Sequence, residues 1–192
     1  LNQGSAVPIL AGGRVTGRVG RFDVGVLNIR SKDEPVSGAL GTNFSVLRVK
    51  RDLLRRSSVG ALLTQRSVGQ NGPGANAAYG LDGTFAFFDN LSINTYWART
   101  RTAGRSGDDG SYRAQLDYAG DRYGLQLERL AVDGHFNPEA GFVRRADMRK
   151  NFGQCRFSPR PRSIRSIRKL SWVGSMAYIE NGSGRLETRE RD

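Results

Sequence analysis

The sequence predicts an all-β fold, an antiparallel up-and-down meander of about ten or eleven strands in a single domain spanning residues 1–192. Three observations support this prediction: runs that alternate apolar and polar residues, turn-forming residues between the runs, and connections that alternate in length. Glycine or a β-branched residue interrupts nearly every window, and no stretch keeps the helical period of about 3.6 residues. A helical fold is therefore disfavoured.

The clearest hairpin is predicted at 111–131, SYRAQLDYAGDRYGLQLERLA, where two alternating runs meet at the turn 119–122. Alternation places every second side chain on the same face of a strand. We therefore expect Leu116, Leu125 and Leu127 to share an apolar face, which in a membrane would point to lipid. The opposite face would carry the polar set Arg113, Gln115, Gln126 and Glu128. Tyr118 and Tyr123 end the apolar stripe, where either a membrane-interface girdle or a soluble two-layer sheet would place them.

The other strands are predicted wherever an alternating run is bounded by Gly, Pro, Asn or Asp. In chain order they lie within 14–30 (two strands joined at 19–21), 44–50, 57–66 (linked to the previous one by 51–56), 79–88, 91–100, 149–158 and 169–179. The pair around Asp89-Asn90 has the residue types of a two-residue hairpin turn. The C-terminal residues 189–192 still read as strand.

Connection lengths alternate between short and long over the first eight strands, and the long connection 132–148 continues the series. Outer-membrane barrels have short periplasmic turns and longer outer loops, whereas a soluble sandwich has no reason to sort its loops in this way. Two later connections depart from the rhythm, because 159–168 is longer and 180–184 is shorter than expected. No apolar run approaches the roughly 18 residues of a membrane helix. The rhythm favours part of an outer-membrane β-barrel.

The charge and cysteine content limit the classes of binding partner and of metal or disulfide site that this chain can have. Thirty Lys and Arg against eighteen Asp and Glu give a net charge of +12, which favours anionic partners. Basic residues cluster at two predicted turns, 50–56 and 160–169, but no stacking aromatics lie among them, so nucleic acid is not expected. Cys155 is the single cysteine, which excludes an internal disulfide and a cysteine-based zinc site. Because the chain begins at Leu1 and ends within a strand, we expect a fragment of a longer protein.

Residues suited to catalysis are few. His135 is the only histidine, so neither a histidine metal cluster nor a choice of catalytic bases is available. Asp133 and Glu139 are candidates to pair with it, although a loop fixed by an Asx turn before Pro138 is the simpler interpretation. The acidic pair Asp108 and Asp109 lacks the spaced ligands of a calcium site. We predict no catalytic residue, no metal and no cofactor.

The long connection 132–148 holds the candidate ligand or pore-mouth residues. Pro138 restricts its own backbone and that of Asn137, which predicts an ordered loop folded partly inward. Phe136 and Phe142 are expected to pack on the barrel mouth, and two arginines to line the entrance for anionic groups. The candidates are His135, Phe136, Asn137, Glu139, Arg144 and Arg145. A loop that simply caps the strands is the alternative.

Several stretches together resemble a known family: VPIL at 7–10, GGRVTG at 12–17, NFSVLR at 43–48, YRAQLDY at 112–118, FNPEAGF at 136–142 and RFSPRP at 156–161. Their order is similar to that in the uncharacterised C-terminal β-barrel-like domain of bacterial outer-membrane proteins that carry an N-terminal family-9-like carbohydrate-binding module. The resemblance implies a Gram-negative outer-membrane location and contact with outer-membrane lipid. It also implies a saccharide as partner of the parent protein, through a module outside this chain, and it transfers no catalytic residue.

These observations lead to one main prediction of function and two alternatives. The main prediction is an outer-membrane β-barrel segment, without enzymatic activity, that acts in transport or anchors a sugar-binding protein. The first alternative is a soluble antiparallel β domain that binds anionic ligands through its basic turns. The second is a hydrolase using Asp108, Asp109, His135 and Glu139, for which the spacing offers no geometric support.

Overall fold

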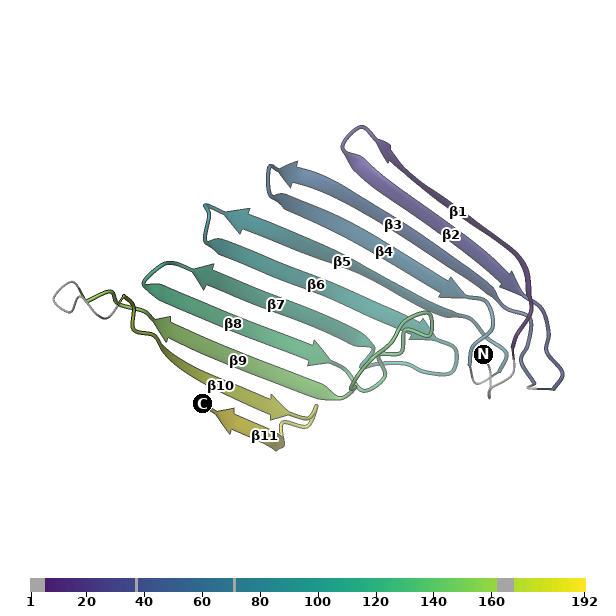
Figure 1. The fold of residues 1–192 in the computed structure, drawn as a ribbon. Coiled ribbons are helices and arrows are strands. Elements are labelled where there is room, and N and C mark those ends of the chain that lie inside the picture. Colours follow the sequence, from purple (N-terminus) through teal and green to yellow (C-terminus); the bar gives the residue numbers. More distant parts are fainter. Residues whose placement is uncertain (1–5, 37, 71, 162–167) are drawn as a thin grey trace.

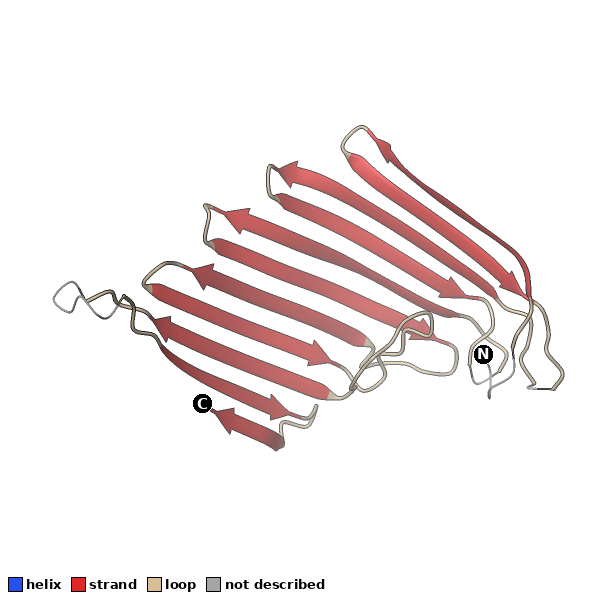
Figure 2. Cartoon of the chain, in the orientation of Figure 1, coloured by secondary structure: helices blue, strands red, loops and turns tan. Residues whose placement is uncertain are grey.

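A computed structural model describes residues 6–36, 38–70, 72–161 and 168–192. The described residues form one antiparallel sheet of eleven strands in sequence order, β1 to β11, and contain no helix (Figures 1 and 2). Consequently, no helix in this part of the chain is long and apolar enough to cross a membrane. The prediction of an all-β up-and-down meander with ten or eleven strands is confirmed.

Ten of the strands are nine to twelve residues long and the last is shorter. In order they are β1 Ile9–Val19, β2 Phe22–Ser31, β3 Asn43–Leu54, β4 Ser57–Arg66, β5 Asn76–Phe87, β6 Leu91–Thr102, β7 Gly110–Ala119, β8 Tyr123–Val132, β9 Met148–Phe157, β10 Trp172–Glu180 and β11 Leu186–Arg191.

Short turns gather at one end of the sheet and longer loops at the other, as Figure 1 shows for the first nine strands. We call these the short-turn end and the long-loop end. The structure corrects the predicted six-residue link at 51–56, because β3 continues to Leu54 and only Arg55 and Arg56 form the turn. The unexpectedly tight turn after β10 is confirmed, since Asn181 and Arg185 are hydrogen-bonded across it. The connection between β9 and β10 lies partly outside the described residues.

The register separates the side chains into two faces. In the β7–β8 hairpin Leu116 pairs with Leu127 and Tyr118 with Leu125, while Gln115 pairs with Glu128. Paired residues point to the same side of a sheet, so the leucines lie on one face and the polar residues on the other. This separation is as predicted. The same alternation, followed through every strand pair, defines an apolar face and a polar face for the whole sheet.

The apolar face is charge-free across the middle of β1 to β10. It bears residues such as Val15, Val26, Leu47, Leu63, Leu81, Trp97, Leu127 and Met176. These eight side chains are all at least 40% exposed, with Val15 at 73%. Only two hydrophobic residues of the described chain, Ala131 and Val132, are buried. The sheet is therefore a single layer whose apolar face has no cover within the described chain.

The polar face is held together by ion pairs and hydrogen bonds. Arg48 of β3 reaches across β4 to Asp82 of β5, with Nη2 donating to Oδ2 at 2.9 Å. This reach depends on Gly60, because a Cβ there would lie 2.6 Å from the Arg48 guanidinium. Farther along the sheet, Glu128 accepts from Arg113 at 3.3 Å and lies 3.7 Å from Lys150 Nζ.

The two outer strands leave the sheet open in the described chain, since no pairing joins β1 to β11. β11 also departs from the pattern of the other strands. Arg189 and Arg191 pair with Tyr178 and Met176, so arginines occupy the side on which the neighbouring strand is apolar. The charge-free band therefore ends at β10.

Candidate functional site

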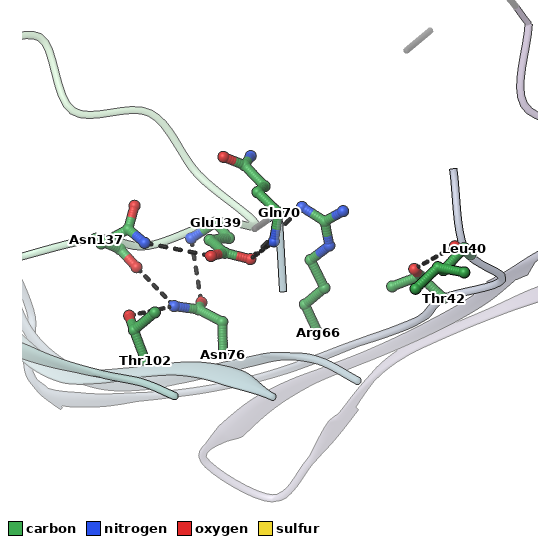
Figure 3. Close-up of polar contacts among 8 residues, drawn as sticks. All are labelled: Leu40, Thr42, Arg66, Gln70, Asn76, Thr102, Asn137 and Glu139. Carbon is green, nitrogen blue, oxygen red and sulfur yellow. Dashed lines mark hydrogen bonds and ion pairs between the residues drawn. The ribbon is translucent and has the colours of Figure 1, made fainter. Parts of the chain in front are cut away.

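The long connection between β8 and β9 folds back over the polar face at the long-loop end, and Asn76 holds it there (Figure 3). The Asn76 amide nitrogen donates to Thr102 Oγ1 and to the Asn137 carbonyl, both at 2.8 Å, and its oxygen accepts from the Glu139 backbone N–H at 3.1 Å. Thr100 Oγ1 accepts from the Asn137 backbone N–H at 3.0 Å. Asn76 and Thr100 are each only 1% exposed.

Glu139 connects this loop to a second one. Its carboxylate accepts from the Gln70 backbone N–H at 2.8 Å and from the Asn137 side chain at 3.3 Å. Arg66 Nη1 lies 3.6 Å from the same carboxylate, whose side chain is only 1% exposed. A buried carboxylate needs partners of this kind to offset its lost hydration. We call Arg66, Gln70, Asn76, Asn137 and Glu139, with the two threonines, the Asn76 network.

The predicted His135 contacts a third loop and neither of its proposed acidic partners. Its ring Nδ1 lies 3.0 Å from the Gly107 carbonyl oxygen, and its backbone N–H donates to Asp108 O at 2.8 Å. Asp133 instead accepts from the Gly110 N–H. The candidate pairing of His135 with Asp133 or Glu139, which the sequence offered as the less simple interpretation, is not formed, and His135 joins two loops.

The acidic pair is divided between two roles. Asp109 accepts from Arg99 at 2.8 Å, whereas Asp108 is exposed and adopts a positive φ of 47°. Within the described residues no group of three or more His, Cys, Asp or Glu side chains is arranged to hold a metal ion. The pair therefore belongs to a tight loop tip joined to the sheet through Arg99.

The predicted loop residues do not all meet. Phe136, Asn137 and Glu139 gather on the polar face over β4 to β6, but Arg144 is exposed and Arg145 forms an ion pair with Glu187 of β11. Phe142 is 88% exposed, so the expectation that it packs back on the sheet is wrong. The ordered, inward-folded part of the loop is the segment before Phe142.

A pocket of about 270 Å³ lies beneath this inward segment. Phe136, Pro138 and Ala140 of the loop cover it, and the sheet supplies its floor. Floor residues on the polar face include Arg48, Leu62, Thr64, Ala78, Asp82 and Tyr96. The pocket thus places one ion pair beside an otherwise apolar surface.

The basic turns are at the opposite end of the sheet. Arg55 and Arg56 are exposed at the β3–β4 turn, and Arg56 Nη1 lies 3.5 Å from Asp89. Arg160 donates to Asp121 at 2.7 Å, while Arg162 and Arg165 of the predicted cluster lie outside the described residues. These basic side chains do not converge on the Asn76 network.

Comparisons of the chain with family models, with curated proteins and with solved structures find no match. The family resemblance described above is therefore untested by them and stays a prediction.

Sequence reasoning missed the sheet side of the site. Asn76 follows a Gly- and Pro-containing loop and is the first residue of β5, a position where an asparagine is ordinary. Arg66, Thr100 and Thr102 are polar residues at strand ends and carry no signal on their own. Only the register that brings β4, β5 and β6 together shows that these residues face one loop.

Proposed function

We propose that this sheet forms part of the wall of a transmembrane β-barrel in the outer membrane of a Gram-negative bacterium. The observation that carries the proposal is the uncovered, charge-free apolar face running through ten strands of a single-layer sheet. A protein surrounded by water rarely exposes apolar patches above a few hundred Å². Lipid is the solvent that such a face requires.

Strand length and end residues support this proposal. Spanning strands need about 9 to 11 residues, and β1 to β10 have nine to twelve. At the short-turn end the apolar face carries an aromatic row, in which Tyr123, Phe157 and Trp172 stack with ring centroids 5.4 and 5.8 Å apart. The other members of this row are Phe22, Phe87 and Tyr118. Aromatic girdles occupy the membrane–water interfaces of spanning barrels.

The polar face then lines the interior, where its ion pairs are exposed to water instead of lipid. The inward loop segment and the Asn76 network narrow that interior at the long-loop end. Transport through the narrowed interior and anchoring of a parent protein are both consistent with this arrangement. The family resemblance adds a further part to the proposal, in which the barrel anchors a sugar-binding module of the parent protein to the membrane.

The decisive experiment is to refold the 192-residue chain with and without lipid vesicles and to follow insertion by flotation and by protection from protease. We expect detergent or bilayers to be required, and the strands to be protected once inserted. A monodisperse monomer that is stable in buffer alone would overturn the proposal and favour the soluble alternative. In that event, binding of anions to Arg55 and Arg56 is the next measurement.

A further inference from the structure

The two ends of the apolar face differ in chemistry. At the short-turn end it ends in the aromatic row, where Arg51 is the one basic residue that the described strands place on this face, and its guanidinium lies 5.1 Å from the Phe22 ring centre. At the long-loop end the same face ends in arginines from four strands. This arginine row consists of Arg30 of β2, Arg99 and Arg101 of β6, Arg129 of β8 and Arg149 of β9.

The arginines lie six to ten positions along their strands from the aromatic row, since Arg129 is six from Tyr123 and Arg101 is ten from Leu91, which pairs with Phe87 and Tyr118. Arg30 is eight positions from Phe22 on β2, and Arg149 is eight positions from Phe157 on β9. Eight positions span about 26 Å along a strand at about 3.3 Å per residue. A barrel strand tilted by about 40° would convert this to about 20 Å across the membrane, so both rows lie near the two surfaces of a thin bilayer.

Aromatic residues support the arginines from the apolar side. The Arg101 guanidinium lies 6.0 Å from the Tyr79 ring centre, and Arg129 donates to the Tyr112 hydroxyl at 3.0 Å. Arg129 also donates to Asn151 Oδ1 at 3.1 Å. These contacts hold the cationic groups at the border of the apolar band while leaving Arg101 and Arg129 exposed.

Acidic groups neutralise only part of this row. Asp109 pairs with Arg99 at 2.7 Å, and Glu180 lies opposite Arg149 in the β9–β10 ladder. No ion pair within the described residues engages Arg30, Arg101 or Arg129. Among β1 to β10, the apolar face therefore carries its largest excess of positive charge at this border.

From this placement we infer that the arginine row binds the phosphate groups of lipid head groups in the leaflet at the long-loop end. This inference rests on the proposed function, since only an inserted sheet presents the row to a lipid surface. Guanidinium groups suit the site because their fork of donors matches two phosphate oxygens and they stay charged. A lipid satisfies both parts of the surface, with acyl chains on the apolar band and phosphate on the arginines.

The test uses the full chain inserted into vesicles of phosphatidylcholine containing a minority of phosphatidic acid. The triple variant Arg101→Gln, Arg129→Gln and Arg149→Gln removes three charges from the row. The matched control, Lys32→Gln, Arg105→Gln and Arg185→Gln, removes three exposed loop charges from the same end. Co-purified lipids are then counted by native mass spectrometry, with inorganic phosphate added in a parallel sample.

We expect the wild type and the control to retain phosphatidic acid in preference to phosphatidylcholine, and the row variant to lose about fivefold in that preference for each arginine removed. Inorganic phosphate should not displace the lipid. Equal retention of the two lipids by the inserted wild type, or equal losses in both variants, would overturn the inference while leaving the proposed function intact. Displacement by inorganic phosphate would assign the row to a free anion and overturn the lipid assignment. Failure of the wild type to insert would overturn both.

Discussion

The two faces of this sheet share one backbone but differ in how their side chains are satisfied. On the polar face charged groups find partners inside the chain, as Arg48 finds Asp82 and Glu128 finds Arg113. On the apolar face Val15, Leu81 and Leu127 remain largely exposed. Many charges of the polar face are therefore satisfied within the chain, whereas the apolar face gains its free energy only when something apolar covers it. Stability of this protein should depend on its surroundings mainly through the apolar face.

Adjacent residues on the two faces provide the sharpest comparison. Leu127 and Gln126 are neighbours on β8 but belong to the apolar and the polar face. We expect Leu127→Arg to reduce the free energy of unfolding in bilayers by about 2 to 4 kcal/mol, because its arginine would lie near the bilayer midplane, between Tyr123 and the arginine row. Gln126→Arg should change it far less. Denaturant titration in vesicles measures both, and equal effects would show that the faces are wrongly assigned.

Among substitutions on the polar face, those in the Asn76 network should have the largest effect on stability. Asn76→Ala removes two donors and one acceptor and leaves the Asn137 carbonyl and the Glu139 N–H without their partners. We expect a local loss of about 1 to 3 kcal/mol, which releases the inward loop and speeds tryptic cleavage after Arg144 and Arg145.

Asn94→Ala is the matched control. Asn94 lies on β6, is half-buried on the polar face that also carries Asn76, and is outside the Asn76 network. Cleavage in inserted protein is followed by gel or mass spectrometry. An unchanged rate for Asn76→Ala would mean that the loop keeps its place without these hydrogen bonds.

Substitutions at two glycines on the polar face, Gly60 and Gly25, test the ion pair that Arg48 and Asp82 form across β4. A Cβ at Gly60 would meet the Arg48 guanidinium at 2.6 Å, whereas at Gly25 the nearest atom would be Thr16 Cγ2 at an ordinary 3.6 Å. We expect Gly60→Ala to lower the free energy of unfolding by about 1 to 2 kcal/mol through overpacking, and Gly25→Ala to have little effect. Combining Gly60→Ala with Arg48→Ala should remove the clash, so a purely additive double variant would contradict this explanation.

The smallest effect on stability is expected at the loop arginines. Replacing Arg144 and Arg145 by Ala removes two exposed charges, one of them paired with Glu187, and surface changes of this kind usually alter stability by less than about 0.5 kcal/mol. If the interior conducts, anion selectivity in single-channel recordings should fall while folding is retained. Arg105→Ala is the control, and unchanged selectivity in a conducting channel would remove these arginines from the pore entrance.

The sequence is enough to predict which residues lie on each face of the sheet, but not which side chains contact one another across several strands. Period-two alternation in 111–131 is enough to place Leu116 and Gln115 on opposite faces, because strand geometry allows no other outcome. The Arg48–Asp82 pair spans two strand intervals and depends on the absence of a side chain at Gly60. Such a contact requires the register of three strands, which no local pattern contains.

The same limit applies to the loop. Pro138 and Asn137 predict its order, and the structure shows part of it ordered on the sheet. Its true anchors, Asn76 and Thr100, come from strands that are distant in sequence. Phe136 and Phe142 look equivalent in the sequence, yet one covers a pocket and the other is 88% exposed. The difference arises because the hydrogen bonds to Asn76 hold the residues just after Phe136 and end before Phe142.

The odd number of strands has a geometric consequence for the two free edges. Successive strands alternate in direction, so β1 and β11 run the same way. A direct seam between them would have to be parallel, with evenly spaced and slanted hydrogen bonds unlike those of the ten existing ladders. An antiparallel seam needs at least one intervening strand that runs in the opposite direction. Two copies inserted in the same orientation would also meet with parallel β1 edges, since a two-fold axis along the membrane normal preserves the direction of each strand.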